Sequence, residues 1–427
     1  MARRWRLPYG PGQVEFTLPP GAEVSLLEPP RLPRLPEPAA AVRQALQRPL
    51  GSPPLVEIVR PGGRVCIVLS DRTRVTGHQV FLPVLLGELT RAGSAVPEVI
   101  FASGAHRPMP APEMRAALGR VAGRVRFQAH TATGACEWLG DTARGTPVLI
   151  NRRALEADHL ILTGSVVHHS FAGFGGGPKA VFPGLAAVAS IEANHRLLLE
   201  PGAAGGALEG NPVHEDLAEA AALARPSFLL NTVTDPGGRL AGVFAGGMVA
   251  AHRAACVMAR TREMPLAGLA DLVVASAGGH PRDIDFYQSQ KALENAARAV
   301  RPGGVVVLVA ACRDGVGSAA FRRWAGDHRS LPELSAALAR RFELGGHKAW
   351  SLARIASQVS VILLSGLDPA VVREFGLRPA VSPRDAIDQA RELSGDRPLT
   401  YLMRAAALTV PVVPDPACAG EPGLAPR

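Results

Sequence analysis

The sequence contains few cysteines, few aromatic residues and almost no lysine, and it has no long apolar run. Its five cysteines are scattered and form no Cys-x-x-Cys pair, which disfavours a zinc ribbon or a disulfide scaffold and favours a reducing compartment. No apolar segment approaches the roughly 20 residues that span a bilayer. The opening MARRWRLPYGPG has basic residues but lacks the apolar core of a secretory signal. We therefore expect a cytoplasmic protein without a membrane segment.

The charge balance is basic, with a net charge of +9, but the basic residues are spread along the chain. With 5% aromatic residues, the sequence has no basic cluster interleaved with rings that stack on bases. We expect a solvated basic surface and no nucleic-acid partner, and we keep nucleic-acid binding as a distant alternative. Hydrophobic residues make up 47% of the 427 positions, which supplies packed cores and excludes a disordered chain.

Lysine is the scarcest basic residue: only Lys179, Lys291 and Lys348 occur among 46 lysines and arginines. A chain that uses arginine for its solvated cations keeps lysine where arginine does not serve. Arginine offers neither a nucleophilic amine nor a compact point charge. All three lysines lie in dense polar motifs, GGGPKA, YQSQKAL and GGHKAW. This pattern marks them as candidate functional residues.

The hydrophobic pattern alternates between short apolar runs and amphipathic segments, which is typical of α/β sheets. The expected strands are 64–70, 98–102, 148–151, 159–163, 272–275, 305–310 and 359–364, and the expected helices are 79–91, 112–118, 285–300 and 383–393. We predict two α/β domains with largely parallel sheets and an active-site cleft between them. The first domain spans 1–265, the second 266–410, and 411–427 is predicted to be a mobile tail.

Polar clusters follow three of the expected strands. They are Asp71 to Arg74, Ser103 to Arg107, and the segment from Gly164 to Lys179. Because ligands of parallel sheets bind at the carboxyl ends of the strands, these clusters predict one site.

The densest segment runs from Gly164 to Arg196 and holds a glycine-rich stretch, with glycine at 173, 175, 176 and 177, together with His168, His169, Lys179 and His195. Consecutive glycines allow close backbone approach to a ligand. The segment is not a Walker A loop, because Pro178 precedes the lysine and Ala180 follows it. The histidines and the lysine make it a strong site candidate.

The combined motifs resemble the lactate racemase family. They are Asp71-x-Thr73-Arg74, Gly104-x-His106-Arg107, His169-x-x-Ala172-Gly173-Phe174, Gly176-x-x-Lys179, Pro183-Gly184, Asn194-His195 and Tyr287-Gln288-x-x-Lys291. The resemblance spans about Leu7 to Val410. It implies a nickel-pincer nucleotide, a pyridinium mononucleotide with two sulfur-containing arms that hold nickel, and a supply of this cofactor by dedicated cofactor-making enzymes.

The resemblance also assigns roles to individual residues. Lys179 matches the lysine that is joined to the cofactor, and His195 matches the protein ligand of nickel. His106 and His169 match the two acid/base histidines. The remaining cofactor-binding positions are Asp71, Arg72, Thr73, Arg74, Gln288 and Lys291. The implied reaction is racemisation or epimerisation of a 2-hydroxy acid by hydride transfer.

Other interpretations of these residues stay open. His168 can exchange roles with His169, His106 can be structural, His195 can be an ordinary residue at a helix terminus, and Trp350 can line a pocket or fill a core. His130, His214, His280 and His347 are expected to cap turns or face solvent. The alternatives for the whole protein are an oxidoreductase or lyase with the same cofactor, and a carrier that stores it.

Four positions depart from the usual pattern of the family. They are Val75 in place of proline, Gly175 in place of serine, Pro178 in place of glycine, and His168 in place of proline. None of them removes a reacting group. Together they predict a substrate pocket that is shaped differently from one made for lactate.

Overall fold

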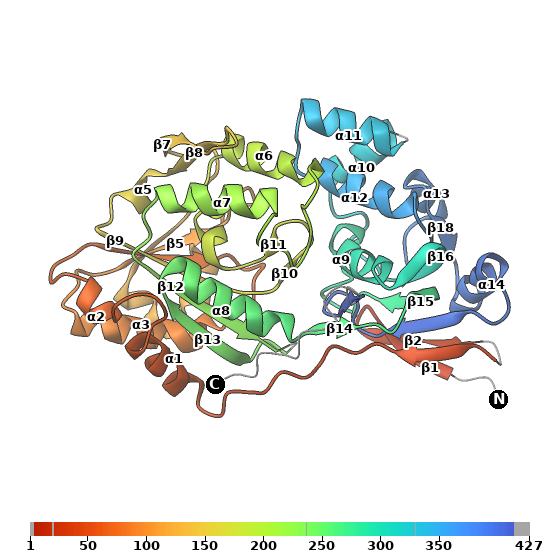
Figure 1. Ribbon diagram of the computed structural model, residues 1–427, viewed down its shortest axis with the longest axis horizontal. Coiled ribbons are helices and arrows are strands. Elements are labelled where there is room, and N and C mark those ends of the chain that lie inside the picture. Colours follow the sequence, from red (N-terminus) through yellow and green to blue (C-terminus); the bar gives the residue numbers. More distant parts are fainter. Residues whose placement is uncertain (1–3, 19–20, 236, 329, 414–427) are drawn as a thin grey trace. The chain divides into compact units, whose positions relative to one another are not determined.

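The computed structural model describes residues 4–18, 21–235, 237–328 and 330–413, and the chain divides into two compact units (Figure 1). The central unit runs from Arg31 to Thr261. The terminal unit combines the described residues up to Pro30 with those from Arg262 onward. Each unit is built around its own six-stranded sheet. The predicted α/β class with largely parallel sheets is confirmed.

The sheet of the central unit is parallel except at one edge. In spatial order its strands are β13 (Leu240–Gly246), β12 (Phe228–Thr234), β9 (His159–Ser165), β4 (Val65–Ser70), β5 (Glu98–Ala102) and β6 (Arg126–Ala129). Only the β12–β13 pair is antiparallel. Residues 65–69 of β4 are all buried, as expected for a strand covered on both faces.

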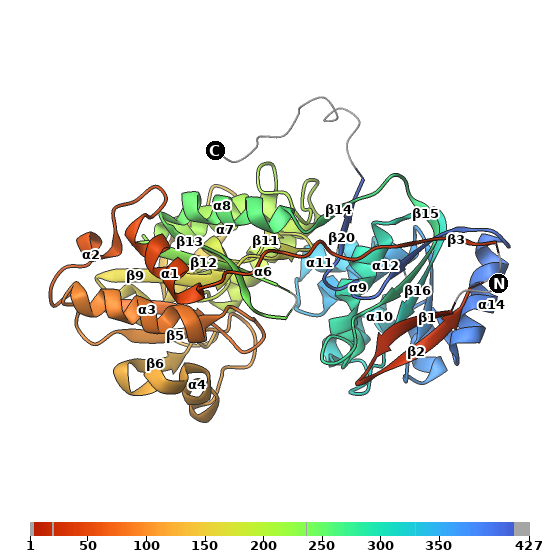
Figure 2. The same ribbon diagram turned by 90° about the horizontal axis from the view of Figure 1, so that it is seen from below.

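Helices cover both faces of this sheet. They are α1 (Pro38–Gln47), α2 (Leu55–Ile58), α3 (His78–Arg91), α4 (Ala111–Leu118), α5 (Arg152–Leu155), α6 (Val188–Arg196), α7 (Pro212–Leu223) and α8 (Met248–Arg260). Helices α1 and α3 share a buried apolar cluster with alternate residues of β4 and β5. Helix α8 packs on β12 and β13 from the other side, and Figure 2 shows α8 and α3 on opposite sides of the sheet.

Short elements complete the central unit. Two antiparallel pairs join β7 (Cys136–Asp141) to β8 (Pro147–Asn151) and β10 (His168–His169) to β11 (Gly173–Phe174). Short 3₁₀ helices occupy Gly119–Arg124, Gly177–Ala180 and Leu197–Leu199. The Gly177–Ala180 turn carries Lys179.

The sheet of the terminal unit is parallel throughout. In spatial order its strands are β18 (Arg378–Ala380), β17 (Ser360–Leu364), β16 (Val300–Val309), β15 (Ala270–Ser276), β19 (Leu399–Met403) and β3 (Glu23–Leu26). Its helices are α9 (Phe286–Ala297), α10 (Ala319–Asp327), α11 (Leu331–Arg340), α12 (Gly346–Ala356), α13 (Pro369–Glu374) and α14 (Pro383–Ser394). The expected helix 285–300 ends at Ala297, because Val300 pairs with Ala270 and begins β16.

The N-terminal residues pack on the terminal unit, although 1–265 was expected to be one domain. Strand β3 extends the terminal sheet beside β19. The antiparallel hairpin of β1 (Arg4–Tyr9) and β2 (Gly12–Thr17) places Leu7 and Phe16 in the same apolar cluster as β15 and β16. The hairpin is also held by Asp283, whose carboxylate accepts from the Gly10 amide at 2.7 Å. Pairing of β3, near the start of the chain, with β19, near its end, therefore places the N-terminal residues in the terminal unit.

The expected mobile tail begins with an ordered strand. Strand β20 (Val410–Val412) pairs in parallel with β14 (Glu263–Pro265), which corrects the expectation for 411 and 412. Residues 414–427 lie outside the described residues. None of the described helices is long and apolar enough to cross a membrane.

A substitution at Phe16 tests whether the N-terminal hairpin belongs to the terminal unit. The side chain is fully buried against the sheet of the terminal unit, so Phe16→Ala should lower the free energy of unfolding by about 3–5 kcal/mol. Val14→Ala, at a partly buried position of the same strand, should cost less. Hydrogen exchange should rise in β15 and β19. A rise confined to β4 and β9 would contradict the assignment.

Candidate active site

Three polar loops meet at one edge of the central sheet. Strand β4 pairs in parallel with β5 on one side and β9 on the other, so the carboxyl ends of all three strands lie together. The loops that follow them begin at Asp71, Ser103 and Val166. This arrangement confirms the expectation that the strand-end clusters converge.

Asp71 and His106 form a hydrogen-bonded pair across two of these loops. His106 Nδ1 lies 2.8 Å from one carboxylate oxygen of Asp71, and the other oxygen accepts from the amide and hydroxyl of Thr73 at 3.0 and 2.5 Å. Burial raises the pKa of Asp71, but the bonds from His106 and Thr73 outweigh burial and lower it overall. Because an ionised carboxylate only accepts, Nδ1 of His106 carries the proton and Nε2 is the basic nitrogen.

The loop that carries His106 is hydrogen-bonded to the segment that follows Lys179 in the sequence. The Gly104 amide donates to the Gly184 carbonyl at 3.0 Å, and the Gly184 amide donates to the Lys179 carbonyl at 3.1 Å. Gly104 has a φ of +53°, and a Cβ there would lie 3.2 Å from the Pro183 carbonyl oxygen. The base and the lysine therefore belong to one packed arrangement.

Two glycines of the lysine turn contact the protein itself rather than leaving space for a ligand. A Cβ on Gly177 would lie 2.4 Å from the His252 ring, and one on Gly176 would lie 2.8 Å from Asn231 Oδ1. The same Asn231 oxygen accepts from the Gly177 amide at 2.8 Å. The expectation that these two glycines give a ligand access to the backbone is thus corrected: they let the turn seat tightly on Asn231 and His252.

The amine of Lys179 sits in an environment that disfavours its charge. Burial and then the positive charge of Arg74 lower its pKa from 10.5 to about 7. A large fraction of the amine is therefore neutral near pH 7, which is the form that acts as a nucleophile. This agrees with the retention of lysine in an arginine-rich chain.

Two neutral imidazoles lie behind the lysine turn. His214 on α7 and His252 on α8 stack with ring centroids 5.9 Å apart, and His252 Nε2 lies 3.0 Å from the Gly175 carbonyl oxygen. Burial is the main reason that both have a pKa of about 4, and the charge of Lys179 lowers both further. His214 is half-buried and does not face solvent as expected. His130 and His347 are buried as well.

His168 and His169 are neighbours with different surroundings. The His168 ring packs on the buried Phe174 ring at 4.7 Å. The His169 ring meets Phe171 edge-on at 4.6 Å, and Phe171 in turn meets His195 edge-on at 5.3 Å. His169 and the candidate metal ligand His195 therefore contact the same ring, that of Phe171.

The hydrogen bond at His169 determines which of its nitrogens carries the proton. Its Nδ1 accepts from the Ala172 amide at 3.3 Å. In the neutral ring, Nε2 then carries the hydrogen and is a hydrogen-bond donor. The neutral rings of His106 and His169 are thus held in opposite tautomers, with a lone pair on Nε2 of His106 and a hydrogen on Nε2 of His169.

His195 lies in the last turn of α6 and is 8% exposed. Its Nδ1 lies 3.2 Å from Asn194 Oδ1. The ring is therefore held on one side by a side-chain amide, and its Nε2 is the nitrogen suited to a metal.

The three arginines near the site differ in their contacts. Arg72 and Arg107 both bind the Glu113 carboxylate, at 3.1 and 2.9 Å. Arg74 reaches the Thr73 hydroxyl at 3.1 Å. An opening of about 270 Å³ lies beside Asp71 and Arg74. A guanidinium next to an opening of this kind suits a phosphate or a carboxylate.

Gln288 and Lys291 lie on α9 of the terminal unit, and both are exposed. The backbone amide of Gln288 donates to Asp285 Oδ1 at 2.7 Å, and this bond caps the N-terminus of α9. In the same unit the Trp350 indole donates to the Ser335 hydroxyl at 2.8 Å, and Lys348 pairs with Glu294 at 3.4 Å. The proposed roles of Gln288 and Lys291 stay predictions.

Sequence reasoning missed several residues that hold the site together. They are Phe171, Asn211, Asp216, Asn231 and His252. Asn211 offered a signal, since Asn before Pro212 is typical of a helix cap. The others depend on contacts between distant segments and left no local pattern.

The chain matches two family models. The lactate racemase N-terminal domain matches residues 9–206, and the lactate racemase C-terminal domain matches residues 267–408. Lactate racemase from Thermoanaerobacterium thermosaccharolyticum is 36% identical over 66% of this chain and 68% of that protein. Lactate racemase from Lactiplantibacillus plantarum is 31% identical over 88% of each chain.

Solved structures give the same result for the fold. The lactate racemase apoprotein from T. thermosaccharolyticum aligns with a TM-score of 0.89 at 29% identity, covering 96% of this chain and all of that chain. A protein from Thermotoga maritima aligns with a TM-score of 0.68 at 18% identity, covering 88% and 99%, and shares the fold.

The low pKa of Lys179 can be measured directly. With only three lysines in the chain, ¹³C-NMR of the reductively methylated protein is simple, and the Lys179 signal should titrate near pH 7. Arg74→Gln should raise that pKa by removing a positive charge. Arg72→Gln is the control, because Arg72 is paired with Glu113. Titration of Lys179 near 10.5, or an equal effect of both variants, would contradict this account.

Proposed function

Because the chain belongs to the lactate racemase family and is an isomerase, we propose that it racemises or epimerises a 2-hydroxy acid with a nickel-pincer nucleotide. When bound, this cofactor supplies a hydride acceptor that can return the hydride to either face of the substrate carbon. The observation that carries the proposal is the Asp71–His106 pair at 2.8 Å, a positioned base in the same packed arrangement as Lys179. A protein that only stored the cofactor would need no such base.

The residues of the central unit fit this cofactor. Lys179 offers an amine with a pKa near 7 for a covalent bond, and His195 offers an imidazole whose Nδ1 already has a partner. Arg74 and the opening beside Asp71 suit a phosphate and the hydroxyls of a ribose. Imidazole suits nickel. The cofactor-making enzymes are the partners that this assignment requires.

The two acid/base histidines supply the proton chemistry of the proposal. A C–H bond next to a carboxylate is too weak an acid for histidine alone, so the histidines act on the hydroxyl instead. His106 Nε2 takes the hydroxyl proton as the carbon becomes a ketone, while Asp71 stabilises the imidazolium through Nδ1. His169 supplies a proton from Nε2 when the ketone is reduced on its other face; it does so as the imidazolium, which requires that the Ala172 amide no longer faces Nδ1.

The substrate carboxylate needs a cation. Arg74 supplies one next to Asp71 and Lys179, and Lys291 is proposed as a second from the terminal unit. Lactate, the substrate named for the relatives, is the simplest member of this class. The departures at Val75, Gly175, Pro178 and His168 favour a larger or more polar 2-hydroxy acid.

A racemisation assay in deuterated water tests the proposed function. The chain, expressed with the cofactor-making enzymes, is given single enantiomers of lactate, malate and longer 2-hydroxy acids. Optical rotation should decay while the hydrogen at Cα is retained, because the hydride is returned internally. Rapid deuteration at Cα would contradict hydride transfer, and fastest turnover of lactate would contradict the expected pocket change.

Variants of the three histidines test the assignment of acid and base. His106→Ala and His169→Ala should each lower kcat about 10²–10⁴-fold, at unchanged cofactor content. His168→Ala is the matched control, since its ring packs on Phe174, and it should cost much less. A large loss in His168→Ala with normal turnover in His169→Ala would reverse the two roles.

A further inference from the structure

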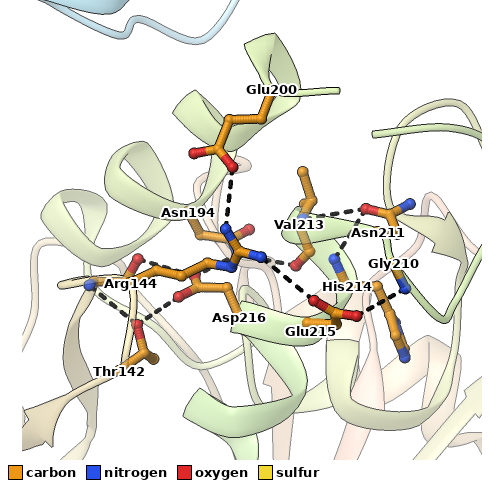
Figure 3. A network of polar contacts seen from close by, with 11 residues as sticks. Thr142, Arg144, Asn194, Glu200, Gly210, Asn211, Val213, His214, Glu215 and Asp216 are labelled. Carbon is orange, nitrogen blue, oxygen red and sulfur yellow. Dashed lines mark hydrogen bonds and ion pairs between the residues drawn. The ribbon is translucent and has the colours of Figure 1, made fainter. Parts of the chain in front are cut away.

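A buried polar network lies between α6, α7 and the β7–β8 hairpin, and part of it is drawn in Figure 3. Its centre is Asp216, which is 1% exposed. The Asp216 carboxylate accepts from the hydroxyls of Thr142 and Thr146 at 2.5 and 2.9 Å and from Asn194 Nδ2 at 2.8 Å. The Thr146 amide donates to the Thr142 oxygen at 3.1 Å. The Thr142 hydroxyl hydrogen is therefore directed at Asp216.

This network determines which way the Asn194 amide points. Asn194 is fully buried, and its Nδ2 donates to the Val213 carbonyl at 3.1 Å and to Asp216 at 2.8 Å. Both partners are acceptors, so a flipped amide would place its oxygen against two other oxygens in a buried site, which is costly. Oδ1 of Asn194 must therefore face His195.

The amide orientation in turn sets the tautomer of His195. Oδ1 of Asn194 is an acceptor 3.2 Å from His195 Nδ1. An acceptor at this position requires the hydrogen on Nδ1, which leaves the lone pair on Nε2. Metal-binding histidines are oriented in the same way, by a partner on the nitrogen that does not bind the metal.

Helix α7, which carries Asp216, is itself anchored around the site. Asn211 Oδ1 caps the helix by accepting from the amides of residues 213 and 214 at 3.1 and 3.2 Å. Its Nδ2 donates to the Phe171 carbonyl at 2.9 Å. Arg144 bridges Glu215 on α7 and Glu200 at 3.4 and 3.1 Å (Figure 3). Helix α7 and its cap thus hold both the Asn194 side chain and the backbone of Phe171, whose ring contacts His195.

We propose that Asn194 and Asp216 are positioning residues that hold His195 with its Nε2 available to nickel. The proposal rests on the proposed function for its metal, but the orientation itself is a property of this chain. The carboxylate fixes the amide, and the amide fixes the imidazole. Neither residue needs to touch the metal or the substrate.

The first test reads the tautomer in cofactor-free protein. Long-range ¹H–¹⁵N NMR of histidine-labelled protein should show His195 as a single Nδ1–H tautomer, with its signal identified by its absence in His195→Gln. Asn194→Ala should give a mixture, because the acceptor is lost. An Nε2–H tautomer in the wild-type protein would overturn the proposal even if no variant folds.

The second test measures how fast the cofactor-loaded protein loses nickel in the presence of a chelator. Asn194→Ala should lose nickel on the order of 10- to 100-fold faster than wild type, the usual cost of removing such a partner. Thr146→Val is the matched control. It removes one bond to Asp216 but leaves the Asn194 bond, so stability should fall while tautomer and retention stay unchanged. Wild-type tautomer and retention in Asn194→Ala would overturn the proposal.

The two tests separate this proposal from the proposed function. If His195→Ala retains nickel like wild type, the assignment of His195 as a ligand fails. The NMR result still decides whether Asn194 sets the tautomer of His195. If His195→Ala loses nickel and Asn194→Ala behaves as wild type, only the positioning proposal fails.

Discussion

The parallel pairing of β4 with β5 and β9 is the constraint on which the site depends. Parallel strands put their carboxyl ends at one edge, so the loops after Ser70, Ala102 and Ser165 have to share the same space. Once they do, a carboxylate from one loop can hold an imidazole from the next, as Asp71 holds His106. No single loop contains both His106 and Asp71.

Tight packing under the lysine turn has electrostatic consequences. Gly176 and Gly177 seat the turn on Asn231 and His252. Burial in this region disfavours the charged form of the Lys179 amine and also keeps His214 and His252 neutral. The low pKa of the Lys179 amine therefore arises from burial and from the nearby charge of Arg74.

Hydrogen bonds then determine the tautomer of each imidazole. His106 and His195 both face an acceptor oxygen with Nδ1, whereas His169 accepts through Nδ1. His106 and His195 therefore keep a lone pair on Nε2, and neutral His169 carries its hydrogen there. The difference lies in their partners, since the side chains themselves are identical.

The sequence by itself determined the α/β class, three of the six strands in each sheet, and the loops that carry Asp71, His106 and Lys179, because periodicity and strand-end position are local properties. Only the tertiary structure decided that β3 and the N-terminal hairpin join the terminal unit, since that depends on pairing with β19, far away in the chain. The same holds for the bonds of Asn194 to Asp216 and of Asn211 to Phe171. A hydrogen bond between distant segments depends on where two backbones meet, and no local pattern records that.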